Sequence, residues 1–324
     1  MARLVFFSLR NGFNARHYLM CAGVRTAYAS LSGRQMQHMS MTTKQTYEAW
    51  LRQKVILNKD AANQQRLVHD VQPLESVDSS ILWVGNRREA KKLVLFLHGG
   101  GFISPPLAGH FDPGGRFPTQ LRQAAAALGA LLDAGARPAD IVVGGDSAGG
   151  NLTMQLLGHL LHPHKDARRI GLAEPLAAAF LVSPWLGCDT ASRSFRENEN
   201  SDMLSKAIVE KLSLGYFDGA EGFRHAAAGG NPWAAPLDGD QGWLEGMGNV
   251  VRSMYVTVGR REVLADHGIG LVRTLRRLDA LGDIRLEESE GEAHDFILLE
   301  GQAKQGGDAT NRMKEWFGSV LAAG

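Results

Sequence analysis

The chain has few cysteines, no long apolar run and almost no net charge. Its two cysteines, Cys21 and Cys188, cannot form a disulfide-rich scaffold, although one bridge between them stays open. Such scarcity is typical of a reducing compartment such as the cytoplasm. No stretch approaches the roughly 20 apolar residues that a membrane-spanning helix needs. A net charge of +1 over 324 residues lacks the basic field expected of a nucleic-acid-binding protein.

The sequence also lacks internal repeats and metal-binding spacings such as Cys-x-x-Cys. Its hydrophobic content of 44% and charged content of 21% are ordinary for a globular protein. The length fits one large α/β domain or two small ones. These properties leave motifs as the main guide to function.

One short stretch organises the rest of the chain. Ile141–Val143 is an apolar run of strand length, Gly145–Gly149 matches Gly-x-Ser-x-Gly, and Asn151–Leu157 is compatible with a helix. Strand, tight turn and helix are the context of a nucleophile elbow, whose strained turn requires small neighbours such as these glycines. The pattern therefore predicts that Ser147 is a nucleophile at a helix N-terminus, where N–H groups favour negative charge.

A second glycine-rich turn follows another apolar run, Leu93–Leu97. The turn is His98–Gly101, whose glycines allow backbone N–H groups to approach a substrate closely. Such a turn supplies part of an oxyanion hole, and the N–H after the nucleophile supplies the rest. We therefore expect the oxyanion donors to be the N–H groups of Gly100, Gly101 and Ala148.

Together the two motifs resemble those of a known family. His98–Gly101 followed by Gly145–Gly150 is similar to the hormone-sensitive-lipase branch of the α/β-hydrolases, and the wider sequence resembles its fungal esterase-like members. The resemblance runs from about Tyr47 to the C-terminus. It implies an α/β-hydrolase fold with a mostly parallel central sheet, helices on both faces and a helical lid. It also implies a serine hydrolase that cleaves a carboxylic ester.

The resemblance assigns the other two members of a catalytic triad. In the family the acid follows a strand, here Met254–Gly259, in an acidic-x-Leu-x-Asp pattern. Glu262 matches the acid position and Asp266 the second acidic position. The family places its general base in a loop after the last strand, where His294 lies, and the order serine, acid, histidine agrees. The implied triad is Ser147, Glu262 and His294, and it needs no cofactor or metal.

The first 47 residues contain no aspartate or glutamate, unlike the rest of the chain. Residues 17–32 are predicted to form an amphipathic helix. Its apolar residues recur at helical spacing: Met20, Val24, Ala27 and Leu31. Three interpretations stay open: a cap helix over the active site, as the family often has, a mitochondrial-type presequence, and a helix in peripheral contact with a membrane surface.

We divide the chain into an N-terminal cap segment, 1–47, and a hydrolase domain, 48–324, with a lid insertion at about 186–250. Aromatic residues of the insertion and its flank either line a substrate pocket or pack the lid onto the core: Trp185, Phe195, Tyr216, Phe217, Trp233 and Trp243. Three histidines at a polar helix end are expected on the surface: His159, His162 and His164.

The chain departs from the family between His98 and Ser147, which lie too close together. A helix and a strand of the family have no counterpart here, and that strand would lie beside Leu93–Leu97. The short segment Phe102–Gly115 is rich in proline and glycine and contains no apolar run. We predict that it is an irregular loop, and that the sheet has about seven strands instead of eight, with exposed strand edges.

The substrate is not evident from the residues. The leading interpretation is a carboxylesterase for a small or medium apolar ester, such as an acetyl ester. A lactone, thioester or amide hydrolase, or an acyltransferase of secondary metabolism, would share the same triad. A catalytically impaired binding protein on this fold is the non-enzymatic alternative, because a fold does not fix a function.

Overall fold

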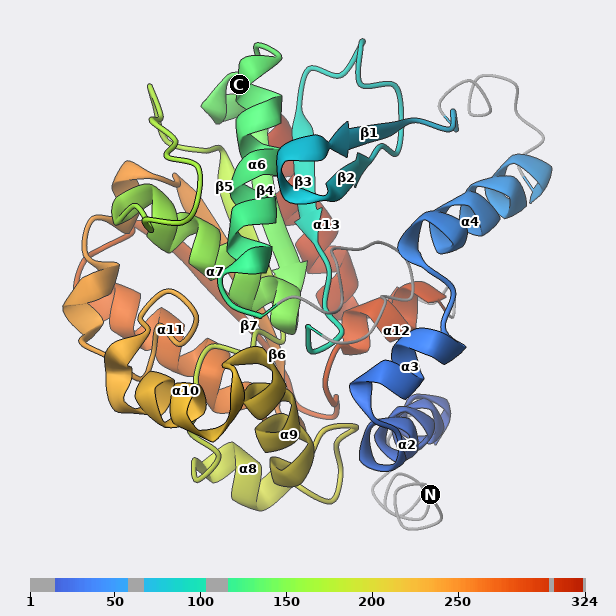
Figure 1. The fold of residues 1–324 in the computed structure, drawn as a ribbon, viewed down its shortest axis with the longest axis vertical. Coiled ribbons are helices and arrows are strands. Elements are labelled where there is room, and N and C mark those ends of the chain that lie inside the picture. Colours follow the sequence, from blue (N-terminus) through green and yellow to red (C-terminus); the bar gives the residue numbers. More distant parts are fainter. Residues whose placement is uncertain (1–14, 58–66, 103–115, 303–305, 323–324) are drawn as a thin grey trace.

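A five-stranded parallel sheet forms the centre of the protein, which we describe from a computed structural model. The structure describes residues 15–57, 67–102, 116–302 and 306–322. The strands lie in the order β3 (Leu93–Leu97), β4 (Ile141–Asp146), β5 (Ala178–Val182), β6 (Ser253–Gly259) and β7 (Asp283–Ser289) (Figure 1). The middle three strands are buried along their whole length, as expected for parallel strands covered on both faces.

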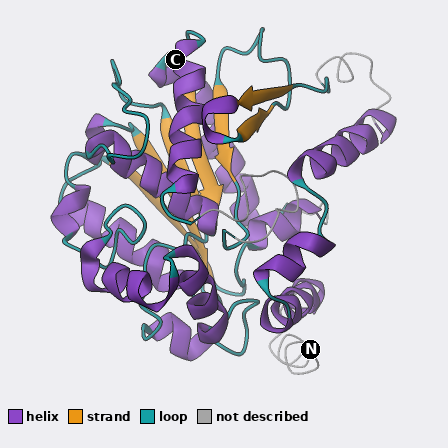
Figure 2. Ribbon diagram, in the orientation of Figure 1, coloured by secondary structure: helices purple, strands orange, loops and turns teal. Residues whose placement is uncertain are grey.

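Alternate residues of these strands point into two cores, one on each face of the sheet. On the first face, residues such as Val143, Leu181 and Val256 pack under three helices: α6 (Thr119–Asp133), α7 (Ala148–Leu161) and α11 (Ala265–Arg277). On the second face, Phe180 and Tyr255 pack under α12 (Phe296–Gln302) and α13 (Asp308–Ala322). Figure 2 shows the strands of the central sheet surrounded by helices. The predicted parallel sheet with helices on both faces is confirmed.

Two further strands form a separate antiparallel sheet. They are β1 (Val71–Leu74) and β2 (Ser79–Leu82), joined by the short helix η1 (Glu75–Val77). Our expectation of about seven strands in one sheet is therefore wrong for the described residues, whose seven strands form two sheets. The family strand that we expect to be absent would lie beside β3. Among the described strands, none pairs with β3 on the side away from β4. Segment 103–115 lies outside the described residues, so its irregular loop stays a prediction.

Among the described strands, β3 has one neighbour and lies at the edge of the sheet. Leu95 and Leu97 are buried toward the first face, whereas Val94 and Phe96 are 48% and 43% exposed. Phe96 stacks on Phe180, with ring centroids 6.0 Å apart, so these exposed residues belong to the second face. An exposed apolar edge strand is a template for pairing with another chain.

The chain between β5 and β6 is mostly helical. It contains α8 (Arg193–Asn198), α9 (Lys206–Tyr216), α10 (Gly219–His225) and the short helices η3 (Ala226–Gly230), η4 (Gln241–Leu244) and η5 (Met247–Asn249). Its first helix, α8, contacts the turn at the carboxyl end of β6, whereas its last short helix leads into the amino end of that strand. Of the aromatic residues considered for a pocket, Trp185, Phe195, Tyr216 and Phe217 are buried within apolar clusters. Trp185 and Phe195 share a cluster with Ala148 at the start of α7, whereas Tyr216 and Phe217 lie in a second cluster whose buried members belong to the insertion.

Three described helices precede the first sheet: α2 (Ala15–Ser30), α3 (Gly33–Met39) and α4 (Thr43–Leu57). The helix predicted at 17–32 occurs as α2, which packs beside α9. Tyr18, Cys21 and Ala22 are buried against the lid and the start of α7, and Met20 and Val24 of the predicted stripe pack against the same cluster while partly buried. The domain division at residue 47 stays a prediction.

The surface position expected for the histidine cluster is wrong for His159, which is only 1% exposed. The chain after α7 folds back over the helix end and satisfies both ring nitrogens. Nε2 lies 2.8 Å from the carbonyl oxygen of Arg168, and the N–H of His164 donates to Nδ1 at 3.0 Å. His162 is partly covered as well, because it stacks on Trp243 with ring centroids 3.9 Å apart.

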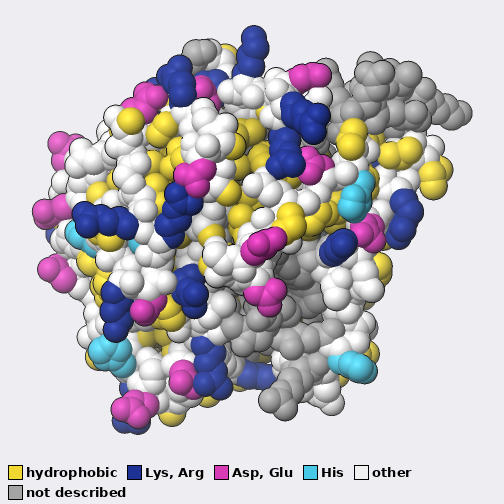
Figure 3. All heavy atoms as spheres, turned by 45° about the horizontal axis from the view of Figure 1, so that its top comes forward, with side chains coloured by type: hydrophobic (Ala, Val, Ile, Leu, Met, Phe, Trp, Pro, Cys, Tyr) yellow, Lys and Arg dark blue, Asp and Glu magenta, His cyan; other side chains and the backbone are white. Residues whose placement is uncertain are grey.

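The surface carries charges of both signs. Figure 3 shows Lys and Arg side chains interspersed with Asp and Glu side chains and apolar groups over the face that it views. Within the described ranges, no helix combines the length and the apolar character that crossing a membrane requires.

The edge position of β3 yields a test by Val94→Lys. A lysine on an exposed edge strand disfavours edge-to-edge pairing, so light scattering during a thermal ramp should fall. The free energy of unfolding should change by no more than about 0.5 kcal/mol, as for other surface substitutions. Val84→Lys, at an exposed valine outside the strands, is the control and should leave scattering unchanged. Equal scattering by both variants would argue against association through β3.

Candidate active site

Ser147 lies at the sharp turn between β4 and α7 in a strained conformation. Its φ of 51° and ψ of −115° are rare for a residue with a side chain. Surrounding backbone bonds hold the turn: its N–H donates to Val182 at 2.8 Å, and its carbonyl oxygen accepts from Asn151 and Trp185 at 3.1 Å. The structure therefore has the elbow that the motif predicts, with the serine at the N-terminus of α7.

The two motif glycines are required by sterics at this turn. A Cβ on Gly145 or on Gly149 would lie 1.9 Å from the carbonyl oxygen of Leu97, far inside van der Waals contact. The end of β3 and the elbow therefore approach each other more closely than any side chain permits.

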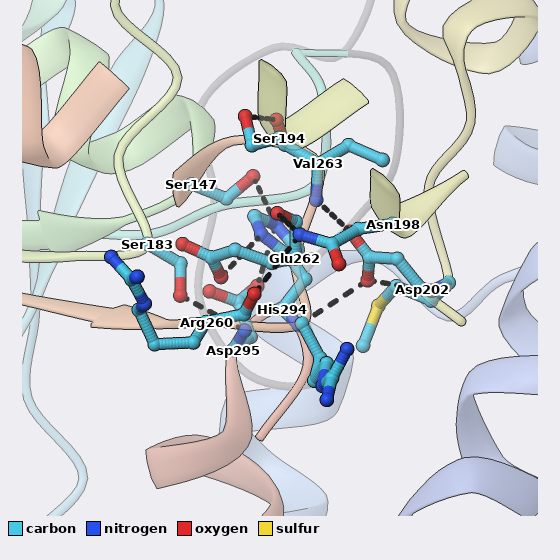
Figure 4. A network of polar contacts seen from close by, with 12 residues as sticks. Ser147, Ser183, Ser194, Asn198, Asp202, Arg260, Glu262, Val263, His294 and Asp295 are labelled. Atoms are coloured by element: carbon cyan, nitrogen blue, oxygen red, sulfur yellow. Dashed lines mark hydrogen bonds and ion pairs between the residues drawn. The ribbon is translucent and has the colours of Figure 1, made fainter. Parts of the chain in front are cut away.

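Two side chains extend from Ser147 in a chain of polar contacts (Figure 4). The Nε2 atom of His294, in the loop after β7, lies 2.9 Å from Ser147 Oγ. On the other side of the ring, Nδ1 lies 3.4 Å from Oε2 of Glu262, in the turn after β6. The side chains of His294 and Glu262 are 2% and 0% exposed. The three residues of the predicted triad are thus brought together away from water.

Asp266 does not approach the histidine ring in this way. Its Oδ2 accepts the backbone N–H of Ser194 at 2.8 Å, and its own N–H donates to Ser194 Oγ at 3.3 Å. These bonds tie the start of α11 to α8 of the lid, so the two acidic positions of the motif have different contacts.

Several buried carboxylates surround His294. Burial alone would lower the pKa of His294, but the negative charges of Asp295, Glu262 and Asp202 outweigh it and raise that pKa above the usual 6.5. Burial also raises the pKa of Asp202 to about 6. The site therefore stabilises a positive charge on the imidazole ring.

The glycine turn after β3 is tied to the elbow by Asp146. The backbone N–H of Gly99 donates to Asp146 Oδ1 at 2.9 Å. The next two residues, Gly100 and Gly101, have φ values of 111° and 63°, which favour glycine. Ala148 is the first residue of α7, directly after the nucleophile. The predicted oxyanion donors therefore come from two turns joined by one hydrogen bond.

Sequence reasoning missed three carboxylates of this site. Asp146 and Asp295 are direct neighbours of Ser147 and His294 in sequence, a signal that was available, and Asp295 Oδ2 lies 3.3 Å from His294 Nε2. Asp202 gives no motif signal, because its partners are backbone N–H groups of distant segments. In the parts of the chain that the structure describes, no cluster of three or more His, Cys, Asp or Glu side chains is arranged to hold a metal ion.

Comparison with known proteins identifies the family. A family model described as the alpha/beta hydrolase fold matches residues 111–298, more than half of the chain. The chain belongs to the α/β-hydrolase-fold family.

A curated relative matches part of the chain. An acetyl-hydrolase from Streptomyces hygroscopicus is 31% identical over 207 residues, which cover 57% of this chain and 62% of that protein. The match thus spans less than two thirds of that relative's length.

Solved structures share the fold. An esterase from the bacterial hormone-sensitive lipase family superimposes with a TM-score of 0.65 at 22% identity, covering 93% of this chain and 97% of that one. An esterase/lipase from an uncultured bacterium gives a TM-score of 0.62 at 20% identity, covering 94% of this chain and 98% of that one.

The close approach at the elbow predicts opposite effects for two glycine-to-alanine changes. Gly149→Ala should destabilise the protein, because its methyl group would overlap the Leu97 carbonyl and push the glycine turn from the nucleophile. Gly23→Ala, in the middle of α2 with open space around it, should instead stabilise by up to about 1 kcal/mol, as expected in a helix interior. Urea unfolding of both variants measures this difference, and an unaltered Gly149→Ala protein would contradict the steric argument.

Proposed function

We propose that the protein is a carboxylesterase of the hormone-sensitive-lipase branch, with Ser147 as nucleophile, His294 as general base and Glu262 as the orienting acid. The observation that carries this proposal is the 2.9 Å contact between His294 Nε2 and Oγ of a serine held at a strained elbow. A buried carboxylate on the opposite ring nitrogen supports it, since a base needs a partner that fixes its tautomer.

The chemistry follows from these contacts. His294 accepts the hydroxyl proton while Ser147 Oγ attacks the ester carbonyl carbon. The N–H groups of Gly100, Gly101 and Ala148 hold the oxyanion of the tetrahedral intermediate, each donor contributing about 3 kcal/mol to lowering the barrier. His294 then protonates the departing alcohol, which leaves an acyl-enzyme on Ser147. Water activated by the same histidine releases the acid.

The proposed substrate is a short-chain ester. The acetyl-hydrolase relative supports this class by its name, and esterases recur among the solved structures of similar fold. Lactone, thioester and amide hydrolysis and acyl transfer use the same triad, and no contact in the site favours them. Initial rates on nitrophenyl esters of increasing acyl length would test the class, and we expect the highest kcat/KM for the acetyl ester.

Ser147→Ala tests the nucleophile. The variant should lose ester hydrolysis and covalent labelling by a fluorophosphonate probe, because no other group at the elbow forms the acyl-enzyme. Ser183→Ala removes a second buried serine near the site, whose Oγ accepts from Asp295 N–H at 3.1 Å, and should keep the label. Mass spectrometry of the labelled peptide identifies the modified residue. A label retained by Ser147→Ala and lost by Ser183→Ala would reverse the assignment.

Glu262→Gln and Asp266→Asn together test the acid. Glu262→Gln removes the charge beside Nδ1 and should lower kcat by about 10⁴-fold, as expected when the tautomer-fixing acid is lost. Asp266→Asn keeps the same size but alters only the contact with the Ser194 backbone, so its effect on kcat should be far smaller. Steady-state kinetics of both purified variants measure these effects. A larger loss of kcat in Asp266→Asn than in Glu262→Gln would make Asp266 the orienting acid.

A further inference from the structure

One buried carboxylate, Asp202, lies between the loop that carries the proposed base and the turn that carries the proposed acid. Its Oδ1 accepts the backbone N–H of His294 at 3.2 Å and that of Met203 at 2.6 Å. Its Oδ2 accepts the N–H of Val263 at 2.8 Å, directly after Glu262. The residue is fully buried, and three N–H donors on one carboxylate match its ionised form.

Asp202 ends a stretch of the lid, residues 194–202, that we call the clamp segment. Three other side chains of this segment donate to carbonyl oxygens of the turn that carries the acid: Asn198 to Arg260 and Glu262, Ser194 to Val263, and Ser201 to Arg261. These bonds fix the acid turn to the lid. Asp202 alone among these four side chains also bonds the loop of the base, as Figure 4 shows.

The clamp segment is in turn held by α2. The Nη1 atom of Arg25 donates to the carbonyl oxygens of Glu199, Asp202 and Leu204, at 2.5, 3.0 and 3.1 Å. Hydrogen bonds from a charged donor are stronger than those from a neutral donor, and the Arg25 guanidinium donates to three carbonyl oxygens of one loop. The N-terminal helix thereby fixes the backbone on which Asp202 stands.

We propose that Asp202 is a positioning residue, which sets the relative place of His294 and Glu262, and that Arg25 couples α2 to the triad through it. This inference rests on the proposed function. Its physical basis is that the base and the acid stand on separate loops, and one rigid carboxylate bonds the backbone of both. A displacement of about 1 Å in a catalytic group is enough to cost roughly 100-fold in rate.

The charge of Asp202 gives a second readout, because it acts on His294 across the buried site. Removing that charge should lower the pKa of His294, since Asp202 is among the carboxylates that raise it. Activity needs neutral His294, so the acid limb (the low-pH side of the profile of kcat/KM against pH) should then move to lower pH. The other titratable groups close to this pair are Glu262, Asp295, Asp146, Tyr18 and Cys21, and the charged guanidinium of Arg25 bonds the Asp202 carbonyl.

Asp202→Asn is the first variant of the test. Its amide retains one acceptor but turns an N–H toward the N–H of Val263, so the acid turn loses its anchor. We expect kcat for a nitrophenyl ester to fall by about 10- to 100-fold, while KM changes by less than about threefold. The acid limb should also shift to lower pH, which loosened packing alone would not produce.

Arg25→Met and Lys211→Met form a matched pair for the coupling. Lys211 Nζ also joins the lid to α2, donating to Tyr28 and Leu31 carbonyls at 2.9 and 2.6 Å, but it bonds no residue of the clamp segment. Arg25→Met should lower kcat by roughly tenfold through the misplaced loop, and Lys211→Met should not. Arg25→Lys should recover most of the rate, since an ammonium group has three donors.

The outcomes separate this inference from the proposed function. Absence of fluorophosphonate labelling in the unaltered protein would reject the esterase, whereas a labelled protein allows the variants to be compared. An Asp202→Asn enzyme with unchanged kcat and an unmoved acid limb would overturn the positioning role. Equal losses in Arg25→Met and Lys211→Met would overturn the coupling, because Arg25 would then only dock α2. If Asp202→Asn is recovered unfolded, the comparison of the Arg25 and Lys211 variants decides.

Discussion

The contact between the end of β3 and the elbow after β4 is the constraint on which the site depends. The Leu97 carbonyl occupies the space where side chains on Gly145 and Gly149 would stand. Together with the bond from Gly99 to Asp146, it sets the glycine turn directly beside the nucleophile. This arrangement uses only the pairing of β3 with β4. The family strand that we expect to be absent would lie on the opposite side of β3, so its absence would leave the elbow and the glycine turn in register.

Electrostatics imposes a second constraint, because burying several carboxylates together is unfavourable unless hydrogen bonds or opposite charge compensate. Here the backbone supplies most of that compensation. Asp202 accepts three N–H groups and Asp146 accepts one, while the His294 ring lies beside Glu262 and Asp295. The same arrangement favours the imidazolium that forms when a serine transfers its proton. Structure and proposed chemistry thus require the same charge distribution.

Sequence reasoning selected Ser147 from its elbow motif, and Glu262 and His294 from the family resemblance, and the structure brings these three side chains together. Sequence reasoning missed Asp202, whose partners Val263 and His294 are 61 and 92 positions away and contribute only backbone N–H groups. It also misplaced His159, since the chain that covers this residue is brought there by tertiary packing. On α2, periodicity placed Met20 and Val24 against the lid cluster but did not identify Tyr18, Cys21 and Ala22 as its fully buried residues.

The lid is not an independent cover over the site. Its clamp segment holds the turn of Glu262 through four side chains, so moving the whole lid as one body would break those bonds and displace the acid. Any opening for substrate must therefore occur in lid elements beyond that segment. Helix α9 is such an element, and its Leu212 lies 2.8 Å from the position of a Cβ on Gly101, in the glycine turn. The clamp segment at the acid turn and α9 at the glycine turn are thus different parts of one insertion, and α2 contacts both of them.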